Sequence, residues 1–234
     1  MPQRFHSELS RRRLLGAGAA LSGLALTGCA SMSSGPSIGR VVVVGGGFGG
    51  ATAARYLKMW GGNVDVTLVE RNASFISCPI SNMVIGGHKQ MADITRAYRG
   101  LNDLGVKVVE CEVVAIDAAA KKVRLAGGAE LAYDRLVVSP GVDFMYEQVG
   151  GLQAAVDSGR ITHSWKAGPQ TVALRKQLES MRDGGVFAMS IPRVPYRCPP
   201  GPYERACMVA SYLKTAKPRS KVLVLDANPE IQSK

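Results

Sequence analysis

Two of the five cysteines lie in sequence surroundings suited to chemistry. Cys78 belongs to the stretch SCPIS, and Cys198 belongs to the proline-rich stretch YRCPPGPYE. A cysteine thiolate is a nucleophile and exchanges with disulfides, so both positions are candidates for covalent or redox roles. Cys111 and Cys207 lie in apolar sequence, where a cysteine is usually a small buried side chain. Together with Cys29, these cysteines show neither CxxC nor metal-ligand spacing, so we predict no metal site.

A glycine-rich turn is the second place where the sequence predicts chemistry. The run VVVVGGGFGGATAA contains the spacing Gly-x-Gly-x-x-Gly at Gly45, Gly47 and Gly50. In a dinucleotide site the first glycine permits a tight turn, the second lets the backbone approach a pyrophosphate, and the third lets a helix pack on a strand. Glu70 follows about twenty residues after Gly50, where a carboxylate accepts hydrogen bonds from ribose hydroxyls. The pattern leaves FAD and NAD open, whereas Glu70 disfavours NADP because it would repel the 2′-phosphate.

Residues 40–70 form the unit that must position these groups. Four consecutive valines predict a buried strand, and an alanine-rich helix follows the glycine turn. The apolar run at 64–69 predicts a second strand, which ends at Glu70. A pyrophosphate would then lie at the positive end of the helix, where backbone N–H groups lack partners of their own.

The stretches that follow predict the rest of a first domain. Hydrophobic spacing and a Gly-Gly pair supply the signals for helix, strand and hairpin. We expect a loop at 72–87, a helix at 93–105, a strand at 106–116, a hairpin of 121–125 with 130–133, and a strand and turn at 134–141.

The C-terminal part predicts the start of a second domain of the same kind. We expect a loop at 150–168, a helix at 170–181, a strand at 186–191, a helix at 203–215 and a strand at 221–226. The first turn of this unit carries prolines in place of glycines. Prolines lack the backbone donors that a pyrophosphate needs, so this unit is not expected to bind NAD, and the first site is favoured for FAD.

Composition bounds the class of protein. With 234 residues, 46% of them hydrophobic and 20% charged, the chain can bury a sizeable core. The net charge of +11 is compatible with an anionic partner, but no basic block is interleaved with aromatic residues, so we expect no nucleic acid.

Residues 1–35 are interpreted as an export signal. The run SRRRLL resembles a twin-arginine motif, and the uncharged run after it is too short for a comfortable membrane span. The stretch LTGC resembles a lipoprotein processing box, which would place a lipid on Cys29. Ordinary cleavage near Ala30, with no lipid, is the alternative. We therefore expect a periplasmic protein that is exported by the twin-arginine route.

From about residue 39 onward, the sequence resembles the flavoprotein subunit of flavocytochrome c sulfide dehydrogenase. That family is related to sulfide:quinone oxidoreductases and to glutathione reductase-like flavoenzymes. The resemblance rests on VVVVGGGFGGATAA, SCPISNMVIGG, YDRLVVSPG, HSWKAGPQT and, most specifically, YRCPPGPYERA. It implies an α/β fold with two Rossmann-like domains: an FAD-binding domain at 36–150, and a second domain at 151–234 that is incomplete.

The resemblance also implies roles for single residues. Cys78 matches the cysteine that holds FAD covalently, and Cys198 matches a redox cysteine that forms a disulfide over the flavin. Pro140 and Gly141 match the turn beside the FAD. Sulfide would be the substrate and a cytochrome c subunit the electron acceptor, since the chain contains no CxxCH haem site.

Two other functions stay open on the sequence. A sulfide:quinone oxidoreductase would use a quinone as acceptor, and a non-catalytic FAD-binding or cytochrome-docking module would need no redox cysteine. Family members continue well past residue 234, and no other cysteine here matches the partner of Cys198. We therefore expect the sequence to be partial.

Overall fold

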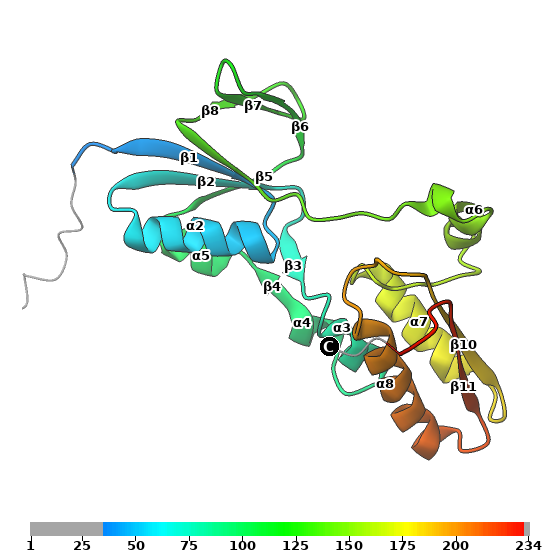
Figure 1. Ribbon diagram of the computed structural model, residues 1–234. Coiled ribbons are helices and arrows are strands. Elements are labelled where there is room, and N and C mark those ends of the chain that lie inside the picture. The colour runs from blue at the N-terminus through cyan, green and yellow to red at the C-terminus, as the bar shows by residue number, and fades with distance from the viewer. Residues whose placement is uncertain (1–34, 232–234) are drawn as a thin grey trace, which may run out of the picture.

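The computed structural model describes residues 35–231, which form two α/β units (Figure 1). The export motif and Cys29 lie outside these residues. The first unit contains a four-stranded parallel sheet, and the second contains a two-stranded parallel sheet with two long helices beside it. This agrees with the predicted α/β class.

The first unit is built on the strand order β5-β2-β1-β9. Val44 at the end of β1 is paired with both Val69 and Val138, so these three neighbouring strands end at the same edge of the sheet. The turn after β1 therefore starts beside the ends of β2 and β9. The strands are β1 (Gly39–Val44), β2 (Val64–Glu70), β5 (Lys107–Glu110) and β9 (Arg135–Val138).

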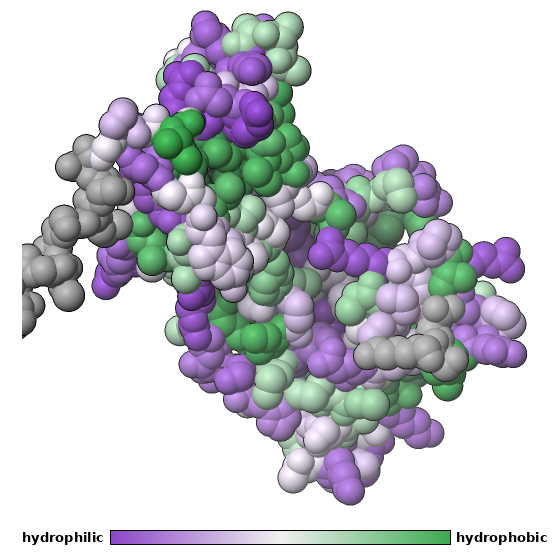
Figure 2. Space-filling view, turned by 60° about the vertical axis from the view of Figure 1, so that its left-hand side comes forward, coloured by the Kyte–Doolittle hydropathy of each residue, from purple (hydrophilic) through white to green (hydrophobic). Residues whose placement is uncertain are grey.

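Both faces of this sheet are covered by apolar contacts. Helix α2 (Phe48–Trp60) lies on one face, where alternate valines of β1 and β2 are buried. A three-stranded antiparallel sheet lies on the other face, and Figure 2 shows hydrophilic residues over its outside and hydrophobic residues beneath it. The predicted unit at 40–70 and the predicted hairpin are confirmed. The antiparallel strands are β6 (Val113–Asp117), β7 (Lys122–Leu125) and β8 (Glu130–Ala132).

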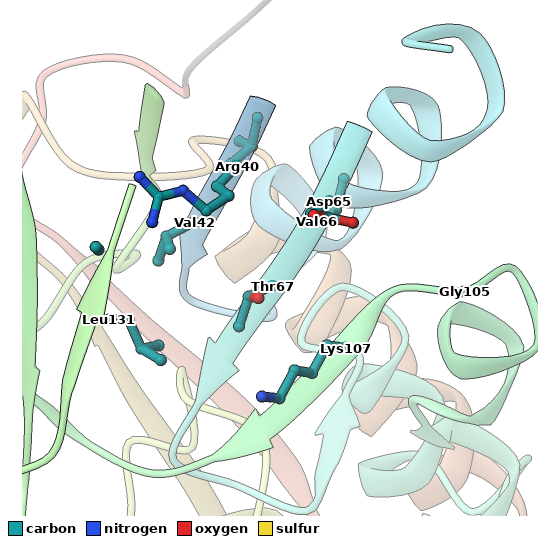
Figure 3. Close-up of a pocket in the computed structure, with 10 residues that line it drawn as sticks. Arg40, Val42, Asp65, Val66, Thr67, Gly105, Lys107 and Leu131 are labelled. Carbon is teal, nitrogen blue, oxygen red and sulfur yellow. The ribbon is translucent and has the colours of Figure 1, made fainter. Parts of the chain in front are cut away.

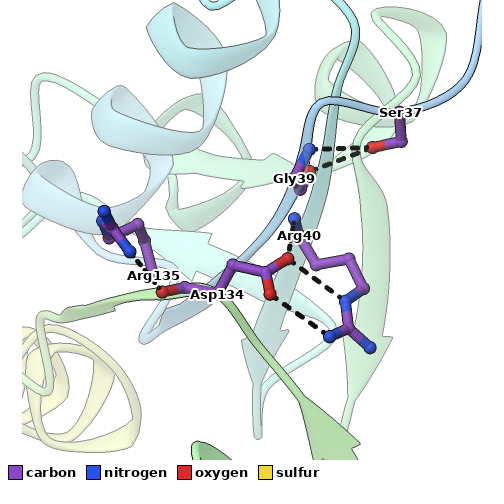
Figure 4. A network of polar contacts seen from close by, with 5 residues as sticks. All are labelled: Ser37, Gly39, Arg40, Asp134 and Arg135. Carbon is purple, nitrogen blue, oxygen red and sulfur yellow. Dashed lines mark hydrogen bonds and ion pairs between the residues drawn. The ribbon is translucent and has the colours of Figure 1, made fainter.

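An ion pair fixes the start of β9 against β1. Asp134 Oδ2 accepts a hydrogen bond from the Arg40 backbone N at 2.8 Å, and the Arg40 guanidinium donates to both carboxylate oxygens at 3.3 Å (Figure 4). Hydrogen bonds from Arg40 hold the pKa of Asp134 below its usual range. Both side chains are about half exposed, so the pair adds little stability and mainly helps to set the register of β9.

The second unit is built from α7 (Pro169–Ser180), β10 (Val186–Ile191), α8 (Gly201–Ala216) and β11 (Lys221–Asp226). The two strands pair in parallel, as a strand-helix-strand unit requires. A short helix from the first half of the chain, α3 (Ser81–Ile85), packs against both α7 and α8. Its Ile85 is fully buried among Leu174, Leu178, Val209 and Leu213.

The prediction of a loop at 72–87 is wrong. This stretch contains strand β3 (Ser74–Ile76) as well as α3. The predicted helix at 93–105 is also wrong, because the chain forms α4 (Met91–Ile94), β4 (Thr95–Ala97) and α5 (Arg99–Asp103). One long-range pairing explains both differences: β3 and β4 form an antiparallel ladder. The ladder holds 95–97 as a strand within the predicted helix, and it holds 74–76 as a strand within the predicted loop.

Two smaller predictions need correction. The strand at 106–116 is split into β5 and β6, because the chain leaves the parallel sheet for the antiparallel one at Cys111. The loop at 150–168 contains helix α6 (Leu152–Asp157).

A substitution at Gly50 tests how closely α2 approaches β1. A Cβ atom at Gly50 would overlap the carbonyl oxygen of Gly45, which is backbone and has little freedom to move. We expect Gly50→Ala to lower the free energy of unfolding by about 2–3 kcal/mol, as is typical of overpacking. Urea unfolding of the full chain measures this, and an unchanged midpoint would contradict the close approach.

Candidate functional site

The glycine turn has the geometry of a dinucleotide cradle. Gly45 adopts φ = +94°, and a side chain there would meet the backbone of Ser139. Gly47, at the N-cap of α2, has no atom within 4 Å of where a Cβ would lie. The turn is therefore crowded on the protein side at Gly45 and Gly50, and open on the solvent side at Gly47.

Glu70 lies beside this turn, at the end of β2. Its Oε2 accepts a hydrogen bond from the backbone N of Gly46 at 2.7 Å. Its Oε1 accepts from the backbone N and the side-chain amide of Asn72, at 2.9 and 2.6 Å. A carboxylate offers about four lone-pair directions, so Glu70 keeps acceptor capacity for ribose hydroxyls.

Tyr98 completes the cradle, a role that sequence reasoning missed. Its hydroxyl donates a hydrogen bond to the Gly46 carbonyl at 3.1 Å, and the side chain is buried under the turn. Burial, helped by the charge of Glu70, raises the pKa of Tyr98 to about 12, so the hydroxyl stays protonated and remains a donor. The apolar spacing around Tyr98 signalled only a core position.

The turn after β9 closes the cradle on its third side. Ser139 N donates to the Val44 carbonyl at 2.8 Å, and the Pro140 Cα lies 3.4 Å from where a Gly45 Cβ would be. Gly141 has φ = +82° and is exposed. The structure thus brings together Gly45, Gly47, Gly50 and Glu70, with Pro140 beside Gly45 and Gly141 next along the same turn.

This arrangement fits the adenosine and pyrophosphate part of FAD. Pyrophosphate oxygens can approach the open Gly47 side of the turn and the N-terminus of the 13-residue helix α2. The ribose hydroxyls would meet Glu70. The pyrophosphate can approach Gly47 closely, because no protein atom lies within 4 Å of where a Cβ of this residue would be.

Cys78 lies in a second part of the site, at the junction of the two units. Its Sγ donates a hydrogen bond to the carbonyl oxygen of Trp165 at 2.9 Å. Burial raises the pKa of the Cys78 thiol, and the Ala167 amide and the nearby Arg205 oppose that rise. Cys78 is thus a half-buried thiol held at the end of the loop that connects β3 with α3.

Cys198 approaches the same junction from the other unit. It adopts the left-handed φ of +59°, which is unusual for a residue with a side chain, and its carbonyl accepts from Gly201 N at 2.9 Å. A Cβ at Gly201 would lie 3.2 Å from the Cys198 Sγ and 3.3 Å from the Trp165 ring. Cys78 and Cys198 therefore share Trp165 as a neighbour, and neither forms a disulfide with a described residue.

Arg205, on the first turns of α8, is the most buried charge of the junction, with 2% exposure. Its Nε donates to Asn82 Oδ1 at 3.0 Å, and its Nη atoms donate to the carbonyls of His163 and Ser164. The guanidinium also lies 3.7 Å from the centre of the Trp165 ring. Burial lowers the pKa of Arg205 to about 10, which still leaves it cationic at neutral pH. Sequence reasoning missed Arg205 and Asn82.

His163 is held neutral beside this arginine. Its Nδ1 accepts a hydrogen bond from the Trp165 backbone N at 3.2 Å, so the Nε2 carries the proton and donates to the Tyr146 hydroxyl at 2.6 Å. Burial and the Arg205 charge lower the pKa of His163. The ring therefore supports the backbone turn that carries Trp165.

A cavity of about 300 Å³ lies elsewhere, between the two sheets of the first unit (Figure 3). Its lining includes Arg40 and Val42 of β1, Asp65 and Thr67 of β2, and Lys107 of β5. The β1 and β2 residues among these lie at the start and in the middle of their strands, whereas the glycine turn follows the end of β1 and Glu70 ends β2. The cavity is thus separate from the candidate site.

Two features are absent from the described range, 35–231. No group of three or more His, Cys, Asp and Glu side chains is placed to hold a metal ion. No helix in that range combines the length and the apolar character needed to cross a membrane.

Comparison with known proteins agrees with this geometry. Residues 39–173 match the family profile of the pyridine nucleotide-disulphide oxidoreductases, which is more than half of the chain. The chain belongs to this family. Residues 171–234 of this oxidoreductase chain match the central domain of the sulfide dehydrogenase (flavocytochrome c) flavoprotein chain. The resemblance found in the sequence is thus confirmed.

Individual relatives point the same way. The oxidoreductase chain is 25% identical to the mitochondrial sulfide:quinone oxidoreductase of Mus musculus over 79% of its length, which is 41% of that protein. It is 58% identical to the sulfide dehydrogenase flavoprotein chain of Chlorobaculum thiosulfatiphilum over 45 residues, 19% of this chain and 94% of that sequence. The chain spans under half the length of the sulfide:quinone oxidoreductases that it matches.

A solved structure confirms the fold. The sulfide:quinone oxidoreductase of Aquifex aeolicus superposes with a TM-score of 0.69 at 23% identity, covering 82% of this oxidoreductase chain and 44% of that one. The predicted α/β fold of the FAD and NAD(P)-binding kind is therefore confirmed.

A substitution at Gly47 separates binding from folding. Because a Cβ there meets no protein atom and φ is −69°, we expect Gly47→Ala to change the free energy of unfolding by less than about 1 kcal/mol. The added methyl group would crowd a bound pyrophosphate, so flavin affinity should fall about tenfold or more. Fluorescence titration of the apoprotein measures the affinity, with Gly50→Ala as the matched folding-defective variant. Wild-type affinity in Gly47→Ala would contradict the assignment of the cradle.

Proposed function

We propose that this chain is the flavin-binding part of a sulfide dehydrogenase that oxidises sulfide and passes the electrons to a cytochrome c subunit. The observation that carries the proposal is the junction at Trp165, where a half-buried thiol from the FAD-binding unit and an exposed thiol from the second unit meet. The match of residues 171–234 to the sulfide dehydrogenase central domain supports sulfide as the substrate.

The cofactor is FAD, held at its adenosine end by the glycine turn and Glu70. Bound FAD would accept two electrons from a sulfur centre and release them to a one-electron carrier. Cys78 would hold the other end of the cofactor through a thioether. The hydrogen bond from its Sγ to the Trp165 carbonyl fixes the direction in which this thiol points.

Cys198 is the sulfur that handles the substrate. In a disulfide with a second cysteine, its sulfur is open to attack by hydrosulfide. A sulfur–sulfur bond forms to the substrate, the original disulfide bond breaks, and the other cysteine leaves as a thiolate. The exposure of Cys198 and its left-handed backbone present the sulfur at the start of α8, where small anions can reach it.

A quinone is the competing electron acceptor, because the relatives that match over most of the chain are sulfide:quinone oxidoreductases. The proposal favours a cytochrome c, since the C-terminal match is to a flavocytochrome c component. Sulfide-dependent reduction of a c-type cytochrome, measured beside reduction of a soluble ubiquinone analogue, distinguishes the two. Faster reduction of the quinone would overturn the choice of acceptor.

Export to the periplasm is part of the same proposal. It rests on the SRRRLL motif and on the LTGC stretch before Ala30. Mass spectrometry of the mature protein from a twin-arginine-competent bacterium is expected to show that residues before Cys29 or Ala30 are removed. A lipid on Cys29 would establish an anchor, and retention of Met1 to Ser10 would contradict export.

The thioether is tested by denaturing the purified protein in acid. We expect flavin absorbance to stay with the peptide that contains Cys78, and to be released completely from Cys78→Ser. Cys207→Ser is the matched control, because Cys207 is exposed on α8 and has no contact with Trp165 among the described interactions. Complete release of flavin from the wild-type protein would contradict covalent attachment.

The role of Cys198 is tested by activity at constant flavin content. Cys198→Ser should retain the flavin and lose about 100-fold or more of the rate of sulfide-dependent cytochrome reduction, because serine cannot form the disulfide. The measurement requires the protein together with its cytochrome. A rate within twofold of the wild type would contradict the role of Cys198, whereas no sulfide-dependent reduction by the wild-type protein with its cytochrome would point to a non-catalytic flavin-binding module.

A further inference from the structure

We propose that Arg205 is a positioning residue, which clamps the Trp165 turn against α3 and so sets the place of the Cys78 thiol. The inference rests on the proposed function in so far as Cys78 is the point of flavin attachment. It adds a residue from the second unit to a site whose cofactor-binding residues all come from the first.

Arg205 contacts two segments that are far apart in the sequence. The first partner, Asn82 on α3, lies four residues after Cys78. The other acceptors, the carbonyls of His163 and Ser164, belong to the segment just before Trp165. The flat face of the guanidinium lies on the Trp165 ring. The acceptors of the Arg205 hydrogen bonds and the ring on which it stacks therefore lie either within two residues of Trp165 or on α3, the helix that follows Cys78.

The consequence for Cys78 follows from its own hydrogen bond. The Cys78 thiol donates to the Trp165 carbonyl. That carbonyl is held in place because Arg205 donates to the carbonyl of the preceding residue, Ser164, and stacks on the Trp165 ring. Asn82 is itself held by a hydrogen bond from its Nδ2 to Glu204, the neighbour of Arg205 on α8. The start of α8 therefore fixes the Cys78 thiol in two ways, through the Trp165 turn and through Asn82 on α3.

This positioning role requires the planar guanidinium group of an arginine. One guanidinium can donate in three directions in its plane and stack through its face, whereas a lysine ammonium is a point charge that does neither. A buried arginine whose donors are all used is also costly to loosen, because the charge would be left without partners. This makes the clamp specific for arginine.

The chain supplies a matched control in Arg175. This arginine lies on α7, stacks on Tyr212 at 4.3 Å, and donates to the Ile85 carbonyl of α3 at 3.0 Å. It fastens the same short helix to the second unit but makes no contact with the Trp165 turn among its described interactions. Arg205→Lys and Arg175→Lys therefore weaken the same interface, and only the first releases the turn.

The test is alkylation of the full chain by iodoacetamide over a range of pH, read by mass spectrometry at the Cys78 peptide. In Arg205→Lys we expect free Cys78 to react about tenfold faster, because one or two charged hydrogen bonds no longer oppose local opening. Its apparent pKa should fall, since burial is the main cause that raises it. Arg175→Lys should leave both the rate and the pKa at wild-type values.

The same spectra report the fraction of Cys78 that carries flavin. If the wild-type peptide is flavin-bound, that fraction should be lower in Arg205→Lys than in Arg175→Lys. If the wild-type peptide carries no flavin, covalent attachment fails, and the alkylation rates still test the clamp. Equal effects of the two substitutions, or a slower reaction in Arg205→Lys, would overturn the positioning role.

Folding is checked within the same experiment. Cys111, in the first unit, should keep its wild-type alkylation rate in a folded variant. If Arg205→Lys exposes Cys111 as well, Asn82→Ala replaces it, since this change removes one acceptor of the guanidinium and leaves the arginine in place. A faster reaction of Cys78 in Asn82→Ala supports the clamp, and a wild-type rate contradicts it.

Discussion

A buried charge imposes the main constraint on how the two halves of the chain meet. Removing a guanidinium from water is unfavourable unless its donors find partners inside the protein. Arg205 finds them on two segments: α3, and the turn at Trp165, whose ring also stacks on the guanidinium. Because both must be present at once, satisfying this one side chain also places Cys78 and the start of α8 side by side.

The parallel sheet imposes the second constraint. Its strands end at one edge, so the glycine turn after β1 necessarily lies beside Glu70 and the turn after β9. Close backbone contacts at Gly45 and Gly50 leave Gly47 as the open side. Backbone geometry therefore shapes a cradle that fits the adenosine end of a dinucleotide, whereas side chains from both units meet at the Trp165 junction.

The two cysteines differ in the way that their proposed roles require. Cys78 is half-buried, with a single carbonyl acceptor, which suits a thiol that forms one permanent bond to a cofactor. Cys198 is exposed on a left-handed turn, which suits a sulfur that must be reached by a small anionic substrate. Cys78 bonds the Trp165 carbonyl, and the Cys198 sulfur and the Trp165 ring both lie beside Gly201.

The sequence by itself determined the elements whose signals are local. The valine run, the glycine spacing and Glu70 predicted the first strand-helix-strand unit, and the proline-rich turn at Cys198 predicted that the second unit differs from an NAD site. Tertiary structure decided the rest. The pairing of β3 with β4 replaced a predicted loop and helix, because a ladder between distant segments is invisible to local periodicity. Arg205 shares a buried helix face with Val209 and Leu213, at spacings of four, which was a readable sign of a buried charge. Its partners, however, come from segments about 40 and 120 residues away, and only the folded chain brings these together.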